Sequence, residues 1–275
     1  MSRVVLQKLL HPGLSAMLLD RGYDQVAGFV VEAAAATGLR TPQALRAAHG
    51  IADDGTPSLD VVRFVLPVCA ALVPPAAVAR PWPNYPHGFL SPVDDAIVPV
   101  WKLSTTRYPP GAELWRIYDD GHQEMVSAYG GAARGWSGAR EWRPTSRYFG
   151  TRAVWNGIEY AADVAGDSVE LTSFTTPQGD GWAQYRDATW SRTVAVGQCD
   201  VYELSFDAVL DDAPVRVLEV IGANVRVQLL DDDPEVARRL DAAMIDLGVF
   251  ELSGIAGSRL TETQLTATHL LAPDA

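Results

Sequence analysis

Lysine is almost absent from this sequence. Of the 22 basic residues in the 275-residue chain, only Lys8 and Lys102 are lysines, and the rest are arginines. The 34 acidic residues outnumber them, which gives a formal net charge of -12 and a pI near 4.8. Nucleic acids and anionic membranes both present negative phosphates, so an acidic chain has no general electrostatic attraction to them. The composition therefore disfavours both partners unless a local basic patch compensates.

Cofactor and metal motifs are lacking as well. The two cysteines, Cys69 and Cys199, have the spacing of neither a metal site nor a redox pair, which favours a reducing compartment. The chain contains no G-x-G-x-x-G, no Walker-type phosphate loop, no H-E-x-x-H and no paired C-x-x-C. Its five histidines lie far apart. We therefore predict neither a bound metal nor a cofactor.

No long unbroken apolar run is present. The most apolar stretch, residues 64–78, contains Pro67, Pro74 and Pro75 and falls short of the roughly 20 residues that a membrane helix needs. Polar residues also interrupt the N-terminal apolar segment before the hydrophobic region of a secretion signal forms. The sequence therefore predicts a cytoplasmic protein that does not bind membranes.

The length predicts two domains, and residues 1–75 have the pattern of an α-rich module. Thr41 followed by Pro42 is typical of a helix N-cap with proline at the first helical position, and good helix formers follow. Residues 26–36 are apolar on nearly all sides, which indicates a buried helix or a passage from strand to helix. Residues 59–64 fit either a strand or a helical turn.

A proline-rich connector is predicted at residues 76–95. Proline fixes φ and removes a backbone donor, so prolines at this density favour an extended, polyproline-like segment. The prolines in and just before this region are Pro74, Pro75, Pro81, Pro83, Pro86 and Pro92.

From residue 96 to 275 the pattern becomes that of an antiparallel β-rich domain. Residues 112–128 predict a hairpin that turns at Asp120-Gly121. Two further β units span 153–171 and 208–230, and an offset of about 55 residues aligns them. They fit either duplicated small barrels of the SH3-like kind or a plain antiparallel meander.

The clearest predicted helix lies near the C-terminus. Asp233 as N-cap, Pro234 at the first position and Glu235 in the first turn predict a helix over residues 234–245. A strand at 248–252 and a terminal edge strand in the tail after Gly257 should follow. The predicted fold class is therefore α+β: a small N-terminal helical module, then an antiparallel β-rich domain with a C-terminal helix.

One basic, aromatic-rich segment stands out from this acidic chain. Between residues 130 and 155 five arginines alternate with aromatic residues, and Glu141 is the single acidic residue among them. Three hypotheses fit: a structural clasp of stacked guanidinium and aromatic groups, a docking surface for an acidic protein, or a site for phosphate or single-stranded nucleic acid. The net charge disfavours the third. The candidate binding residues are Arg134, Trp136, Arg140, Trp142, Arg143, Arg147 and Tyr148.

An enzyme is the alternative hypothesis. Arg116 lies on the first strand of the predicted hairpin, with His122 and Glu124 just downstream, a layout that resembles NAD-consuming ADP-ribosyl-transferring enzymes. On this hypothesis the enzyme acts on a phosphate-bearing small molecule such as NAD, by ADP-ribosyl transfer or glycohydrolysis. Arg116 and one of the arginines of residues 130–155 bind the phosphates, and Glu124 or Glu159 is the acid-base group. Such enzymes usually place Glu or Gln two positions before the catalytic Glu, and this chain has no such pair.

The leading functional prediction is a non-catalytic module that binds another protein, acidic at the contact, in a bacterial cytoplasm. An immunity protein that neutralises a toxin is one concrete version, and the sequence does not favour it over a scaffold.

Overall fold

The computed structural model describes residues 4–73, 88–91, 93, 97–231 and 233–270. The chain is β-rich, with 52% of residues in strands and 12% in helices, and its paired strands are antiparallel throughout. Most of the predicted connector lies outside the described residues. Its described part includes the strand β5 (Gly88–Leu90), which pairs with β6 (Ile97–Pro99).

The first half of the chain forms a seven-stranded sheet. Two helices, α1 (Pro12–Arg21) and α2 (Pro42–Ala48), lie between its first three strands in sequence. In spatial order the strands are β4 (Leu72–Val73), β7 (Trp101–Arg107), β2 (Gln25–Glu32), β1 (Val5–Leu9), β3 (Ser58–Val65), β8 (Glu113–Tyr118) and β9 (Gln123–Ala128).

The predicted N-terminal helical module is therefore wrong. The apolar run at 26–36 is mainly the strand β2, and residues 59–64 lie in β3. Both faces of the sheet are buried: Val30 and Val62 pack in the core on the α1 side, and Val31 and Val61 pack in the core that contains Leu45 of α2. A strand covered on both faces shows no polar alternation, so its sequence looks like that of a buried helix. The predicted helix after Thr41 is confirmed as α2.

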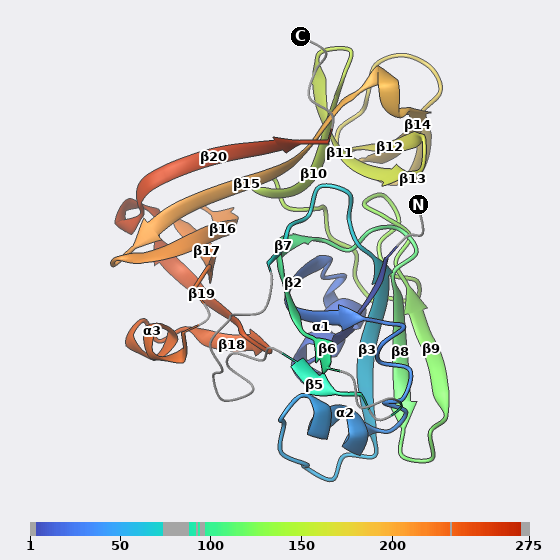
Figure 1. Ribbon diagram of the computed structural model, residues 1–275. Coiled ribbons are helices and arrows are strands. Elements are labelled where there is room, and N and C mark those ends of the chain that lie inside the picture. Colours follow the sequence, from blue (N-terminus) through green and yellow to red (C-terminus); the bar gives the residue numbers. More distant parts are fainter. Residues whose placement is uncertain (1–3, 74–87, 92, 94–96, 232, 271–275) are drawn as a thin grey trace.

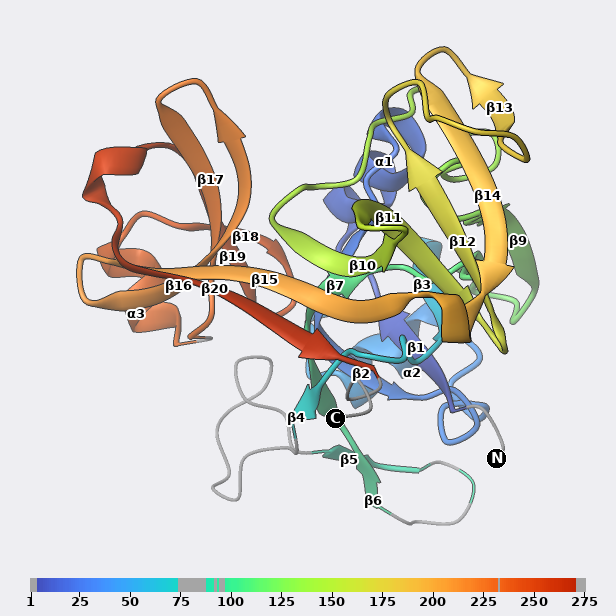
Figure 2. The ribbon, with the colours of Figure 1, turned by 90° about the horizontal axis from the view of Figure 1, so that it is seen from above.

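The second half forms an eleven-stranded sheet built along one long ribbon. In this ribbon β15 (Asp200–Leu210) pairs with β20 (Thr261–His269) along most of its length. The opposite edge of β15 pairs with β10 (Phe149–Trp155) over its first half and with β16 (Ala213–Ile221) over its second half. Figure 1 shows the ribbon crossing between two groups of strands, and Figure 2 shows it passing over the first sheet.

Each group of strands extends from one half of the ribbon. One group continues from β10 through β11 (Ile158–Ala165), β12 (Ser168–Ser173), β14 (Thr189–Ala195) and β13 (Ala183–Arg186). The other continues from β16 through β17 (Asn224–Leu229), β19 (Val249–Ala256) and β18 (Ala243–Asp246). The remaining elements are α3 (Pro234–Arg239) and two 3-10 turns, Val196–Gln198 and Gly257–Arg259.

All three predicted β units are found, but the described strands do not close into a barrel. Because β10 and β16 share the long strand β15, the two units that were aligned in the sequence become branches of one open sheet. Whether they arose by duplication stays a prediction. The C-terminal helix begins at Pro234 as predicted but ends at Arg239. The following residues form β18, which pairs with β19 instead of extending the helix.

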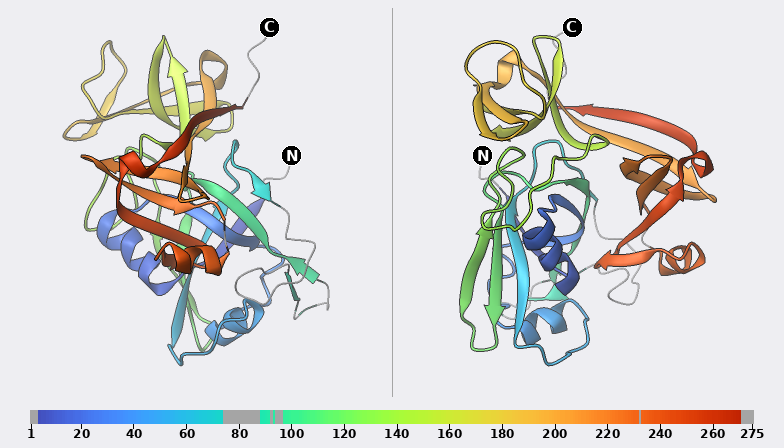
Figure 3. Two further views of the ribbon diagram at one scale, coloured as in Figure 1. Left: turned by 90° about the vertical axis from the view of Figure 1, so that its left-hand side faces the viewer. Right: turned by 180° about the vertical axis from the view of Figure 1, so that it is seen from behind.

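Buried polar contacts join the two sheets. Lys8 Nζ on β1 lies 2.8 Å from Asp246 Oδ2 on β18, and both side chains are almost fully buried. Helix α1 also contacts β18, and Figure 3 shows it between the first sheet and the β16–β19 group. The Gln25 side-chain amide donates to both Gln228 and Glu251 across the same boundary. The link from β9 to β10 therefore passes from one sheet to the other, across a boundary that these buried contacts join.

Candidate functional site

The segment that joins β9 to β10, residues 129–148, contains every candidate binding residue. Its first part is structural. Trp136 is 4% exposed, its Nε1 donates to the Tyr23 carbonyl at 2.8 Å, and its ring contacts Tyr108 and Tyr129 with centroids 5.2 and 5.3 Å away. Trp136 is thus a core residue, and its indole is inaccessible to a partner.

Arg134 connects the segment to the β11–β14 group. Its two terminal nitrogens each lie 2.7 Å from a different oxygen of Glu170, and one also donates to the Tyr185 hydroxyl. The guanidinium carbon lies 4.5 Å from the Tyr185 ring centroid. The hydrogen bonds to Glu170 raise the pKa of Arg134 above its usual value. This bidentate, stacked arrangement is a clasp of the kind that the sequence suggested.

The middle of the segment passes over the end of α1. Gly22 has φ of +62°, and a Cβ there would lie 2.6 Å from the Glu141 carbonyl oxygen, so only glycine allows this close approach. Trp142 is half-buried, with the Arg186 guanidinium 4.5 Å from its ring centroid. Arg140 is 80% exposed and lies 3.3 Å from Asp20. A surface pair of this kind contributes little to stability and leaves Arg140 accessible.

The last part of the segment leads into β10. Arg143 lies 3.4 Å from Glu219, and Tyr148 is half-buried against Phe206, with ring centroids 6.0 Å apart. Arg147 differs from these residues. It is exposed, and the structure gives it no ion pair, hydrogen bond or ring contact with any residue that it describes.

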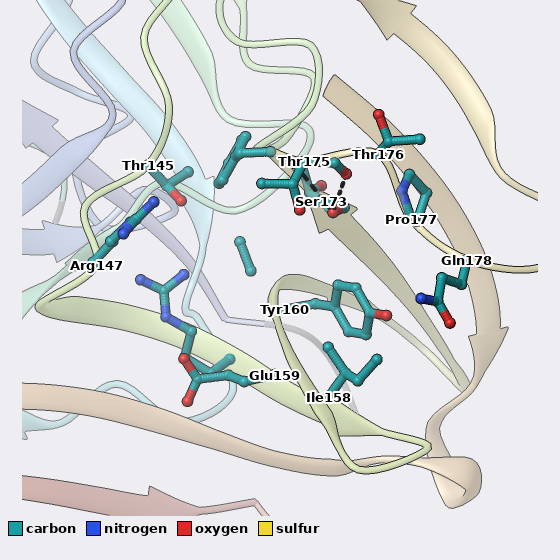
Figure 4. A pocket seen from close by; sticks show the side chains of 14 residues that line it. Thr145, Arg147, Ile158, Glu159, Tyr160, Ser173, Thr175, Thr176, Pro177 and Gln178 are labelled. Carbon is teal, nitrogen blue, oxygen red and sulfur yellow. Dashed lines mark hydrogen bonds between the residues drawn. The ribbon is translucent and has the colours of Figure 1, made fainter. Parts of the chain in front are cut away.

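Two hollows share Arg147 and Thr145 as lining residues. The first, of about 470 Å³, lies against β10, β11 and the segment after β12, and we call it the Arg152 hollow. Figure 4 shows Arg147 and Thr145 at one end of it and Tyr160, Ile158 and Gln178 toward the other. Its remaining lining residues are Arg152, Glu159, Ala161, Thr172, Ser173, Phe174, Thr175, Thr176 and Pro177. The second, of about 580 Å³, lies on the other side of the segment and is lined by Arg21, Arg143, Tyr148 and Glu219, among others.

Arg152 is the residue that sequence reasoning missed as a site candidate. It is one of three described arginines that are buried, at 4% exposure. Arg46 pairs with Asp53 and Asp54, and Arg107 pairs with Asp163. No described carboxylate lies within 4.0 Å of Arg152. The available signal was an arginine inside β10, where residues 149–153 are otherwise small, aromatic or apolar and all buried.

The hydrogen bonds of Arg152 are incomplete. One terminal nitrogen, Nη2, donates to the Ser146 carbonyl, whereas Nε is buried without an acceptor among the described groups. The hydroxyls of Thr145 and Thr172 in the same wall are also buried without a partner there. Burial, and then the nearby Arg107 guanidinium, lower the pKa of Arg152 to about 10. Arg152 therefore still carries its charge at neutral pH.

Glu159, which the enzyme hypothesis named as an acid-base candidate, also lines this hollow. Its carboxylate accepts a hydrogen bond from the Tyr202 hydroxyl. Desolvation of Tyr202, together with this bond, raises the tyrosine pKa. Glu159 thus contributes one negative charge beside two cations, and the hollow has a net positive charge.

The other residues of the enzyme hypothesis, Arg116, His122 and Glu124, lie elsewhere, on the β8–β9 hairpin. Arg116 and Glu124 are register partners, but two nitrogens of Arg116 donate to Asp60 at 2.8 and 3.0 Å. The Glu124 carboxylate accepts a hydrogen bond from the Tyr118 hydroxyl. The His122 ring stacks on the Tyr118 ring. His122 borders a separate hollow beside residues 33–40, and neither Arg116 nor Glu124 is among its lining residues.

Among the described residues, no three His, Cys, Asp or Glu side chains come together in a way that would hold a metal ion. In the same part of the chain, no helix has the length and apolar character needed to cross a membrane. Comparison of the chain with protein-family models, with curated proteins and with solved structures finds no match.

Proposed function

We propose that this protein is a non-catalytic binding protein that docks an acidic surface of a partner protein on the face around Arg147. The observation that carries the proposal is Arg147 itself, an exposed cation that has no carboxylate within 4.0 Å among the described residues, in a chain of net charge -12. An acidic chain has ample carboxylates to neutralise a surface arginine. An arginine left open between two hollows is suited to an external carboxylate.

The surroundings of Arg147 support the same proposal. Arg140, at 80% exposure, and Arg143, whose side chain is 32% exposed, precede it in the same segment. The core contacts of Trp136 and the clasp of Arg134 hold this segment in place. A partner therefore meets preformed cations, and less conformational entropy is lost on binding than with a free loop.

We place this binding in the cytoplasm, because Cys69 and Cys199 are both free thiols and free thiols persist in reducing compartments. Neutralisation of a toxin is one form that such binding can take, and the identity of the captured partner decides between that form and a scaffold.

The test is capture of the partner by the wild-type protein and by two charge-reversal variants, followed by titration with the purified partner. Arg147→Glu should weaken binding at least about tenfold, because it places like charges together at the contact. Arg40→Glu is the matched control, since Arg40 is exposed on the distant loop at 33–40 and the change in net charge is the same. Affinity should also fall as salt is raised.

Equal affinity of the Arg147→Glu and Arg40→Glu variants for the purified partner would refute the docking face. Consumption of NAD by the purified wild-type protein would refute the non-catalytic assignment.

A further inference from the structure

The Arg152 hollow combines features that a structural cavity does not need. Burial of a charged group is costly unless the group is paired, and Arg152 has no carboxylate within 4.0 Å among the described residues. Buried donors normally have acceptors, yet Arg152 Nε has none within the described structure. The unsatisfied hydroxyls of Thr145 and Thr172 belong to the same wall. The three residues that carry these groups all line one hollow of about 470 Å³.

We propose that the Arg152 hollow is a receptor for a carboxylate group, held between the guanidinium groups of Arg147 and Arg152. The carboxylate comes either from an Asp or Glu side chain of a partner or from a free organic acid. The first source rests on the proposed function, whereas the second does not require a protein partner.

The charge of the hollow favours a single negative charge. Arg147 and Arg152 supply two positive charges, and Glu159 supplies one negative charge. A carboxylate balances the remaining positive charge, whereas a phosphate dianion would exceed it and would meet repulsion from Glu159. Planar guanidinium groups also match the geometry of a carboxylate.

The walls of the hollow fit the carbon chain of such a ligand. Ile158, Tyr160, Phe174 and Pro177 line the space beyond the arginines, and Figure 4 shows Tyr160, Ile158 and Pro177 away from the end that holds Arg147. The volume is within the range of about 300 to 1,000 Å³ typical of small-molecule sites. A carboxylate with a short methylene chain places its charge at the arginines and its apolar part against these side chains.

The test uses glutarate as the probe, with neutral glutaramide and inorganic phosphate as comparisons, and follows thermal unfolding and titration calorimetry of the full chain. Glutarate should raise the melting temperature in a concentration-dependent manner, and glutaramide and phosphate at equal ionic strength should not. Arg152→Met should weaken glutarate binding about tenfold or more, because a charge-assisted hydrogen bond is lost. Arg40→Gln, remote from the hollow, should bind like wild type.

Thr172→Val keeps the experiment decisive if Arg152→Met fails to fold, because it removes one buried hydroxyl and nearly preserves the side-chain shape. It should weaken glutarate binding several-fold. Equal stabilisation by glutarate and glutaramide, equal glutarate affinity of wild type and these variants, or no stabilisation by glutarate would overturn the receptor. Partner capture that survives such a result would leave the docking face in place. If glutarate binds but no protein partner is captured in a way that depends on Arg147, the carboxylate that the hollow receives comes from a free organic acid.

Discussion

Arg107 and Arg152 are buried to nearly the same extent, at 3% and 4% exposure, on the neighbouring strands β7 and β10, yet their surroundings differ. Arg107 Nη2 donates to the Ala162 carbonyl at 2.7 Å and lies 3.4 Å from Asp163. Burial opposes its charge and lowers the pKa, but Asp163, Tyr129, Asp24 and Glu203 together outweigh burial, and the pKa of Arg107 is raised. The space beside Arg107 is only about 20 Å³.

Arg152 has no such carboxylate and borders a hollow of about 470 Å³. The difference separates two uses of a buried arginine. Where a carboxylate of the same chain pairs with the guanidinium, as Asp163 does with Arg107, the residue holds two sheets together, even though Arg107 Nε and Nη1 are buried without acceptors among the described groups. Where no described carboxylate pairs with the guanidinium and an open space borders it, as for Arg152, the residue is available to a ligand.

The largest expected effect comes from breaking the paired site. Asp163→Asn leaves Arg107 buried without its ion-pair partner and should lower the free energy of unfolding by about 3 kcal/mol. Urea unfolding measures the change. Asp167→Asn, an exposed position in the turn that follows the same strand, should cost less than about 0.5 kcal/mol. A cost of the same small size at Asp163 would show that the Arg107 pair is not structural.

His49, another buried base, sharpens the comparison because burial favours its neutral form. Burial and then the nearby Lys8 charge lower its pKa to about 4, against roughly 6.5 in the unfolded chain. The unfolded state therefore takes up a proton that the folded state does not, and stability is lost as the pH falls from about 6.5 toward 4. By pH 5 the loss should reach about 2 kcal/mol.

His49→Gln isolates this contribution. Burial raises the pKa values of Asp24, Asp163 and Glu203, and these groups change stability in the opposite direction as the pH falls. The quantity to measure by urea unfolding is therefore the stability of wild type minus that of the variant, at pH 7 and at pH 5. It should shrink by about 2 kcal/mol at the lower pH, and an unchanged difference would mean that His49 is not held neutral by the fold.

The smallest effect is expected at the unpaired arginine. Arg152→Met removes a hydrogen bond to the Ser146 carbonyl, worth about 1 kcal/mol, and also removes a buried charge that lacks a partner. The two contributions offset each other, so the free energy of unfolding should stay within about 1 kcal/mol of wild type. Arg107→Met is the matched variant and should cost about 3 kcal/mol, because it leaves Asp163 buried and unpaired. Similar costs for both variants would remove the distinction between the two arginines.

Local sequence signals predicted the turns and caps well. The Thr41 side chain caps α2 by accepting a hydrogen bond from the backbone amide of Ala44. The Asp233 side chain caps α3 by accepting one from the backbone amide of Glu235. Asn156 and Gly157 both have positive φ in the predicted turn between β10 and β11. Each of these features depends on chemistry within a few residues, which the sequence shows directly.

The candidate site was predicted only in part, because the sequence shows directly only the chemistry within a few residues. The sequence singled out Arg134, Trp136 and Arg147 as one group because all three are arginine or tryptophan in one segment. Their roles differ through contacts that are distant in sequence: Arg134 bonds to Glu170, Trp136 bonds to Tyr23, and Arg147 has no partner within the described structure.

The sequence by itself determined the turns, the helix starts and the antiparallel β character of the second half, because alternation and capping are local. Only the tertiary structure decided that the N-terminal half is a sheet, since strands buried on both faces lack alternation. It also decided which arginine remains open. Arg107 has an ion-pair partner among the described residues and Arg152 does not because of how β7 is placed against β10 and β11 in the fold. No pattern within a single strand encodes that placement.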